Sequence, residues 1–246
     1  MTYIIHPTYE HIKKFILSIP ISFQKEKSTI HNARNVIKVL NYQEKSYVVK
    51  SFKVPHLLNR IVYSLFRNSK AKKSYENSLK ILDFVPAPIA YIEKKKSTLI
   101  HQSFFISEHF KYDFTIREPM HDTNIKDTLA IFKQFAEFTY KLHNQGVLHL
   151  DYSPGNILIK KEKDNYIFKI VDINRMEFKT LTLDERLQNF SKLWAKDEDM
   201  KVIIKEYAKL MDADENYCID KAIAYSQKNK DIKNFKKRLK GKKVHD

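Results

Sequence analysis

Hydrophobic and polar positions alternate in several short segments of the first hundred residues. Three of these segments are rich in Val, Ile, Tyr and Thr and are separated by polar turns: 27–32, 35–42 and 46–52. The pattern is typical of β-strands. A helical spacing follows from about Ser69 to Phe84, and prolines end it before two more strand-like segments at 89–93 and 98–107. The first half is therefore predicted to be mostly β with one embedded helix.

The second half has a helical pattern interrupted by one hairpin. The clearest helix is predicted from about Lys126 to Asn144, and Gly146 follows it where a left-handed cap is needed. A hairpin is predicted from 156–160 and 166–173, and the rest is helical in pattern. We expect an α+β, bilobal fold: a β-rich N-lobe at about 1–108, a hinge at about 107–111 and a mainly helical C-lobe at about 112–246. Small ligands usually bind in the cleft of such a fold.

Composition narrows the class of protein. The 246 residues are 43% hydrophobic and 13% aromatic, which is enough for a core. The single cysteine, Cys218, forms no internal disulfide and no cysteine cluster for zinc, and it favours a reducing compartment. The uncharged, mostly apolar stretch from Phe15 to Phe23 has nine residues and is too short to span a bilayer. We expect a cytoplasmic protein.

The net charge of +16 predicts an anionic partner. Half of it comes from the segment between Lys228 and Lys243, which has nine basic residues and one acid, within a basic C-terminal tail at 228–246. Ile232, Phe235 and Leu239 would form a thin apolar stripe on a helix there. Three interpretations remain open: a solvated terminal helix whose apolar residues dock on the domain, a helix on an anionic membrane surface or acidic partner, and a nucleic-acid contact.

The segment His149–Asn156, followed by Asp172-Ile173-Asn174, carries the clearest chemical signal. Asp151 precedes Asn156 by five residues and Asp172 by 21. This order resembles the catalytic loop and metal-binding strand of the protein-kinase-like superfamily. The resemblance implies that Asp151 orients or accepts the proton of an attacking hydroxyl, and that Asn156 and Asp172 hold Mg²⁺ on the phosphates of ATP. Carboxylate and amide oxygens are the hard ligands that magnesium prefers.

Three upstream residues complete the expected nucleotide site. Lys50 ends a strand-like run, where kinases carry the lysine that binds the α- and β-phosphates. Glu76, on the first predicted helix, is the expected partner of Lys50. Glu108 lies at the predicted hinge, where backbone groups would meet adenine.

Several details differ from an ordinary protein kinase. Ser153 stands two residues after Asp151, where protein kinases usually have lysine, and only 74 residues follow Asp172. Together with the segments 69–77, 149–158 and 171–176, these features resemble the lipopolysaccharide kinase family of Kdo and heptose kinases. The resemblance implies ATP- and Mg²⁺-dependent phosphorylation of a sugar hydroxyl in the lipid A–core region. It also implies an anionic glycolipid partner, and a cytoplasmic protein that contacts the inner face of a bacterial inner membrane peripherally.

One departure concerns the phosphate-binding loop. The chain has three glycines and no G-x-G-x-x-G motif, and Ala33 stands in the turn between the first strands where glycine is expected. Arg34 is the candidate that would cap the phosphates by charge instead. His149 is interpreted as a structural histidine that hydrogen-bonds backbone near the metal-binding strand.

Two other functions remain open on the sequence alone. The first is an atypical Ser/Thr protein kinase. The second is a pseudokinase that uses its basic tail to bind membrane or nucleic acid, although the presence of Lys50, Asp151, Asn156 and Asp172 argues against a dead enzyme. We expect no nucleic-acid partner for the enzyme.

Overall fold

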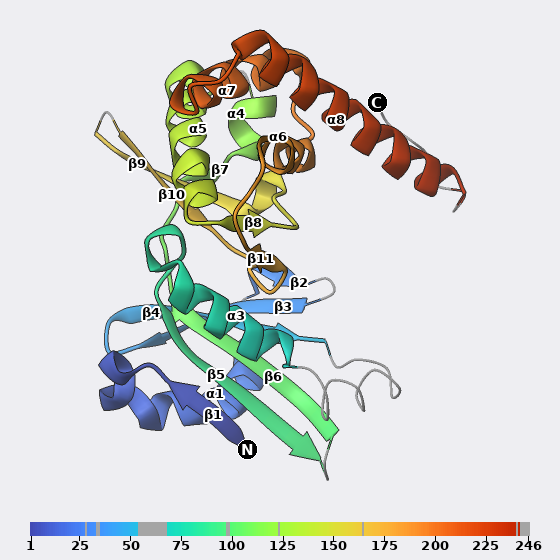
Figure 1. Ribbon diagram of the computed structural model, residues 1–246. Coiled ribbons are helices and arrows are strands. Elements are labelled where there is room, and N and C mark those ends of the chain that lie inside the picture. Colours follow the sequence, from blue (N-terminus) through green and yellow to red (C-terminus); the bar gives the residue numbers. More distant parts are fainter. Residues whose placement is uncertain are drawn as a thin grey trace. The chain divides into compact units, whose positions relative to one another are not determined.

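The computed structural model describes residues 1–27, 29–32, 35–53, 68–96, 99–122, 124–163, 165–239 and 241. The chain forms two compact units (Figure 1). The first comprises Met1–Lys111 together with Asp172–Asn174, and the second comprises Tyr112–Val171 and Arg175–Asp246. The first is built around a large sheet and the second is mainly helical, so the predicted fold class is confirmed.

The N-terminal unit is organised by a six-stranded antiparallel sheet with the order β1-β5-β6-β4-β3-β2. Its elements are β1 (Thr2–Ile5), η1 (Pro7–Ile12), α1 (Lys13–Lys25), β2 (His31–Asn32), β3 (Asn35–Tyr42), β4 (Lys45–Phe52), α3 (Lys70–Lys80), η2 (Leu82–Phe84), β5 (Pro88–Lys96) and β6 (Leu99–Glu108). The long strands β4, β5 and β6 lie inside the sheet and bury most of its apolar side chains.

The two faces of this sheet are covered by different helices (Figure 1). Ile16 and Ile19 of α1 pack with Val49 of β4 and Ile106 of β6 in one buried cluster. A second cluster contains Ala71 and Tyr75 of α3 with Phe52 of β4 and Tyr91 of β5. Because successive side chains of a strand point to opposite faces, Lys50, next to Val49, lies on the α3 face.

The N-terminal helix α1 was not predicted, so the expectation of one embedded helix in the first half was wrong. The buried residues Ile12, Ile16, Ile19 and Phe23 recur at helical spacing, and together they cover the sheet. Among the described residues of the strand predicted at 27–32, only the last two are extended, in β2.

The C-terminal unit contains small sheets and five helices among its described residues. Its elements are β7 (Phe114–Thr115), α4 (Arg117–His121), α5 (Thr128–Asn144), β8 (Val147–His149), η3 (Pro154–Asn156), β9 (Ile157–Glu162), β10 (Asn165–Ile170), β11 (Met176–Phe178), α6 (Leu183–Phe190), η4 (Ser191–Leu193), α7 (Asp197–Leu210) and α8 (Glu215–Arg238). Strands β7, β9 and β10 form one sheet, and β8 pairs with β11.

The core of the C-terminal unit is aromatic. The ring of Phe135 in α5 lies 5.9 Å from the ring of Tyr152 and 5.9 Å from that of Phe168. It also contacts Phe190 of α6, whose ring lies 5.0 Å from that of Tyr207 in α7. These buried rings fix the helices against the segment between β8 and β9.

The predicted left-handed cap at Gly146 is confirmed. Gly146 has φ +71°, and its N–H donates to the carbonyl of His143 in the last turn of α5. A Cβ atom there would lie 2.7 Å from the carbonyl oxygen of Lys179. Glycine is therefore required both by the backbone conformation and by the close approach of the Lys179 backbone.

No helix in the described part of the chain combines the length and the apolar composition that crossing a bilayer requires. The basic tail forms the end of α8 as far as residue 238, and Lys240, Lys242 and Lys243 lie outside the described residues. Ile232, Phe235 and Leu239 are exposed by 45%, 62% and 71%, so they do not dock on the rest of the domain.

Candidate active site

Lys50 lies near the end of an interior strand. Its register partners are Ile37 on β3 and Phe105 on β6, so its backbone is fixed from both sides. The side chain is only 13% exposed, and its Nζ lies 5.4 Å from the centre of the Phe52 ring. A lysine is seldom buried to this extent without an anionic partner.

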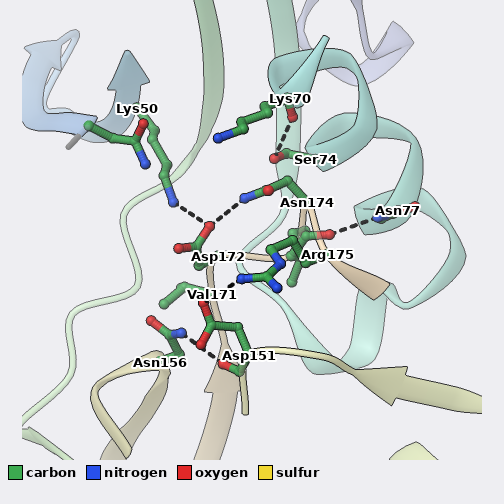
Figure 2. A network of polar contacts seen from close by, with 12 residues as sticks. Lys50, Lys70, Ser74, Asn77, Asp151, Asn156, Val171, Asp172, Asn174 and Arg175 are labelled. Atoms are coloured by element: carbon green, nitrogen blue, oxygen red, sulfur yellow. Dashed lines mark hydrogen bonds and ion pairs between the residues drawn. The ribbon is translucent and has the colours of Figure 1, made fainter. Parts of the chain in front are cut away.

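That partner is Asp172. The Nζ of Lys50 donates to Oδ1 of Asp172 over 2.8 Å (Figure 2). Asn174 donates its side-chain Nδ2 to the same oxygen. Lys50 and Asp172, predicted to act on phosphates and magnesium, are therefore brought together within the N-terminal unit.

Asp172 has an unusual backbone conformation. Its φ is +59°, in the left-handed region that aspartate and asparagine tolerate better than other residues with a side chain. The residue follows Val171, whose N–H donates to the carbonyl of Asn156 in the catalytic loop. Val171, which is hydrogen-bonded to the loop, is therefore followed directly by the aspartate that Lys50 binds.

Helix α3 holds the segment after Asp172 through Asn77. The Nδ2 of Asn77 donates to the carbonyl of Ile173 over 2.7 Å (Figure 2). Neither Asn77 nor Asn174 was predicted from the sequence to be a site residue. The available signal was their position, since Asn77 lies one residue after Glu76 and Asn174 two residues after Asp172.

The predicted pair between Lys50 and Glu76 is not formed. Glu76 accepts a hydrogen bond from Asn68 over 2.9 Å and lies 3.7 Å from Nζ of Lys72. The buried face of α3 contains Ala71, Ser74, Tyr75 and Ser78, whereas the Glu76 side chain is 42% exposed. The helical phase therefore turns Glu76 away from the sheet, and Asp172 takes its place as the partner of Lys50.

Glu108 is the last residue of β6. Its backbone N–H donates to the carbonyl of Ala87, and its carboxylate accepts the hydroxyl of Tyr9 over 2.9 Å. Burial and the Glu108 carboxylate raise the pKa of that Tyr9 hydroxyl. The contact of this region with adenine stays a prediction. Ala33 and Arg34, in the turn expected to cap the phosphates, lie outside the described residues.

In the C-terminal unit, His149 fixes the start of the catalytic loop. Its ring is fully buried, the N–H of Asp151 donates to Nδ1, and Nε2 donates to the carbonyl of Val171 over 3.1 Å. Because the backbone N–H occupies Nδ1, the proton of the neutral ring lies on Nε2. The interpretation of His149 as a structural histidine is confirmed.

The loop then folds back on Asp151. Asn156 donates its Nδ2 to the carbonyl of Asp151 over 2.9 Å (Figure 2). The N–H of Ser153 donates to the same carbonyl. These bonds fix the orientation of the Asn156 amide, with the nitrogen toward the loop backbone. The amide oxygen is the atom suited to a hard cation.

Arg175 lies beside the Asp151 carboxylate. The N–H of Leu150 donates to the carbonyl of Arg175, and β11 then pairs with β8. The guanidinium lies 3.8 Å from Oδ2 of Asp151 in an ion pair that is largely exposed (Figure 2). Sequence reasoning gave Arg175 no role.

A buried polar chain supports the loop from behind. Asn189 of α6 donates to the carbonyl of His149 over 2.9 Å and accepts from Nε2 of His143, whose Nδ1 accepts from the hydroxyl of Tyr207. Burial lowers the pKa of His143 to about 4 and raises that of Tyr207 to about 12. Both side chains are therefore neutral near pH 7, as this hydrogen-bond chain requires.

The donor set fits a nucleotide and its metal ion. Lys50 is a cation suited to phosphate oxygens, and the carboxylate of Asp172 and the amide of Asn156 offer hard oxygens. Asp151 offers a carboxylate that is 43% exposed and so accessible to a substrate hydroxyl. Phosphoryl transfer, which depends on positioning and charge neutralisation, uses groups of these types.

Comparisons with solved structures show a kinase-like fold. The structure "WaaP in complex with acyl carrier protein" has a TM-score of 0.61 and 12% sequence identity, over 93% of this chain and 99% of that chain. The Rio2 kinase–ADP/Mg²⁺–phosphoaspartate complex from Chaetomium thermophilum has a TM-score of 0.51 and 15% identity, over 87% of this chain and 67% of that chain. No curated protein matches the sequence significantly.

The family comparison covers more than half of the chain. The model of the lipopolysaccharide kinase (Kdo/WaaP) family matches residues 75–213. The match includes the catalytic loop, Asp172 and the supporting residues His143, Asn189 and Tyr207. The chain is therefore a kinase and belongs to the lipopolysaccharide kinase (Kdo/WaaP) family.

Proposed function

We propose that the protein transfers the γ-phosphate of ATP to a hydroxyl of Kdo or heptose in the lipid A–core region of lipopolysaccharide. The contact between Lys50 and Asp172 carries the proposal. It joins a cation for phosphate oxygens to a carboxylate for magnesium, in a chain of this kinase family.

The proposal gives each of the four residues predicted from the sequence a role in the reaction. Lys50 binds the phosphates, and Asn156 and Asp172 would hold Mg²⁺ through their oxygens. Bound ATP and magnesium supply the phosphoryl group and neutralise its charge. Asp151 orients the acceptor hydroxyl and takes its proton on a carboxylate oxygen.

Arg175 supplies the cation beside Asp151. Ser153 occupies the position where protein kinases usually have lysine, and its N–H is bonded to the Asp151 carbonyl. The guanidinium of Arg175 pairs with the Asp151 carboxylate instead. We infer that Arg175 holds this carboxylate in place before the acceptor arrives.

The test is transfer of labelled phosphate from ATP to Kdo–lipid A. The wild-type protein should label the glycolipid, and Asp151→Asn and Asp172→Asn should each lower kcat by a factor of about 10² to 10⁴. Asp220→Asn, an exposed change on α8 with the same loss of charge, is the control and should keep full activity. Normal turnover by the Asp151 or Asp172 variant would overturn the assigned roles.

An atypical protein kinase is the second candidate. The fold similarity to the Rio2 kinase is the observation that favours it. The same labelling experiment, run with a cell lysate, discriminates between the two, because label on protein and never on glycolipid would support this alternative. Membership of a kinase family removes the support for the pseudokinase interpretation.

We also propose that the outer face of α8 contacts an anionic membrane surface. Ile232, Phe235 and Leu239 are exposed and recur at i, i+3 and i+7, and Lys228 and Lys236 lie about one turn before and one turn after Ile232. An apolar stripe with flanking cations suits a bilayer of anionic lipid. The solved WaaP structure contains acyl carrier protein, so a protein partner is the competing occupant.

A further inference from the structure

A cluster of cations lies on the opposite, inner face of α8. Lys233 and Lys237 place their ammonium groups 4.8 Å and 5.3 Å from the centre of the Trp194 ring. Lys192 precedes Trp194 by two residues, in η4, and its charge acts on Lys233. We call these four residues the Trp194 cluster: Lys192, Trp194, Lys233 and Lys237.

The backbone around the cluster is fixed by hydrogen bonds. Asn229 donates its Nδ2 to the carbonyl of Ser191 over 2.7 Å, and Lys230 donates its Nζ to the carbonyl of Ala195 over 3.0 Å. These bonds dock α8 on both sides of Trp194. Lys233 and Lys237 follow one and two helical turns later on the same face, so they are aimed at the ring by the helix itself.

The segment just before the cluster is hydrogen-bonded to the start of the loop that carries Asp151. Asn189, three residues before Lys192, donates to the carbonyl of His149, two residues before Asp151. Burial and the charge of Lys192 lower the pKa of Lys233, while Asp151 acts in the opposite direction. Among the described groups, Asp151 is the acid that acts on Lys233.

Such a cluster is electrostatically unfavourable in the free protein. Two ammonium groups lie against one ring and the charge of Lys192 acts on one of them, whereas Asp231, the acid on the same stretch of α8, accepts a hydrogen bond from Gln227 instead. The backbone holds these like charges close together, and the binding of an anion between them reduces their repulsion. The arrangement therefore indicates a site for an anionic group beside the loop that carries Asp151.

We propose that Lys233 and Lys237, at the ring of Trp194, together with Lys192, two residues before that ring, bind a carboxylate or phosphate of the acceptor sugar while Asp151 meets its hydroxyl. The proposal rests on the proposed function and adds a substrate class. The acceptor is a sugar that carries an acidic group near the hydroxyl to be phosphorylated, and a neutral sugar is rejected because the cations stay unpaired. Trp194 is part of this site.

Direct binding can be measured without turnover, because Trp194 is the single tryptophan of the chain. The probes are free Kdo, glucosamine 1-phosphate and the methyl ester of Kdo, which lacks the negative charge. We expect a saturable change in tryptophan fluorescence with the two acids and none with the ester. The variant Lys233→Gln/Lys237→Gln should weaken binding at least about tenfold, the loss expected when charge-assisted contacts are removed.

The matched control is Lys228→Gln/Lys236→Gln, which removes the same charge from the outer face of α8. It should change the affinity for the acids less than about twofold. Equal loss in both variants would show a general effect of charge and overturn the site. Absence of a saturable response with both acids would also overturn it.

Kinetics separate this inference from the proposed function. In the glycolipid assay, Lys233→Gln/Lys237→Gln should raise the KM for the acceptor about tenfold and leave the KM for ATP unchanged. An unchanged acceptor KM would overturn the site while the kinase assignment stands. Binding of Kdo without transfer to any glycolipid would support the site and overturn the proposed function.

Discussion

The ammonium group of Lys50 lies 2.8 Å from Oδ1 of Asp172, although the two residues are 122 positions apart in the sequence. Lys50 belongs to an interior strand, and Asp172 follows β10 in a left-handed conformation. The contact is part of the N-terminal unit. Lys50 and Asp172 were assigned from separate sequence motifs, and their side chains are in direct contact.

The first prediction concerns nucleotide affinity. Lys50→Ala removes the ammonium group that we assign to the phosphates and leaves Asp172 without this partner. We expect the affinity for ATP with Mg²⁺ to fall by about 10- to 100-fold, the usual range for a lost charge-assisted contact. Isothermal titration calorimetry measures the change.

Lys45→Ala is the control for Lys50→Ala, because Lys45 begins the same strand and is exposed. It should bind ATP as the wild-type protein does. If both variants bind equally well, Lys50 is not a phosphate ligand.

A second prediction tests the residues that position Asp172. Asn77→Ala removes the bond from α3 to the carbonyl of Ile173, and Asn174→Ala removes a donor to Asp172. Each change should raise the concentration of magnesium needed for half-maximal activity several-fold, since partners of a metal ligand typically contribute about 10- to 100-fold in metal affinity. Saturating magnesium should restore most of the rate. A lower rate with an unchanged magnesium dependence would indicate a structural effect alone.

The third prediction concerns stability at acidic pH. His143 is almost completely buried, and its pKa of about 4 lies below the ordinary value near 6.5. Between these values the unfolded chain takes up a proton that the folded protein refuses, so stability falls as the pH decreases from 6.5 toward 4. The loss between pH 7.5 and pH 5 should be about 2 kcal/mol.

Urea unfolding at the two pH values measures this loss. His143→Phe keeps a ring in the core and has no titrating group, so its stability should depend less on pH even where it is lower overall. The same loss of stability in the wild type and in the variant would place the titrating group elsewhere.

The sequence predicted the fold and the chemistry better than the partners of individual residues. Local patterns were sufficient for the secondary structure, because spacing and turn residues report backbone conformation directly. They gave the strands around Lys50, the helix before Gly146 and the order of Asp151, Asn156 and Asp172. The Lys50–Glu76 pair did not follow, since one helical residue more or less rotates a side chain by about 100°.

Other features depend on long-range packing. Asn77, Arg175 and Asn189 are polar residues in segments without a distinctive local pattern, and their roles arise only when the chain brings them to Ile173, Asp151 and His149. Helix α1 could have been recognised from the spacing of its buried isoleucines. The stretch contains Pro20 and no charge, so it was considered only as a membrane span and not as a helix of the domain.

A fourth prediction concerns the glycine after α5. Gly146→Ala places a methyl group against the carbonyl of Lys179 and keeps φ at +71°. Folding stability should fall by about 2 kcal/mol or more, because both the strain and the clash must be relieved. Gly241→Ala is the control, since Gly241 also has a positive φ but a Cβ atom added there would meet no heavy atom within 4 Å. Its effect on thermal unfolding should be small, and equal effects of the two changes would exclude the clash with Lys179.

The last prediction tests membrane contact by the outer face of α8. Ile232→Ser/Phe235→Ser/Leu239→Ser removes three exposed apolar side chains that contribute little to the fold. Sedimentation with phosphatidylglycerol vesicles should show at least about tenfold weaker binding, since each apolar side chain that enters the interface contributes roughly 1 kcal/mol. Ile4→Ser/Ile21→Ser/Leu82→Ser is the control, because it removes three exposed apolar side chains from the N-terminal unit and should bind as the wild type does. Equal binding of the wild type to phosphatidylcholine would contradict a role for anionic lipid. Binding to neither lipid, with retention of an acidic carrier protein by the wild type but not by the α8 variant, would assign this face to a protein partner instead.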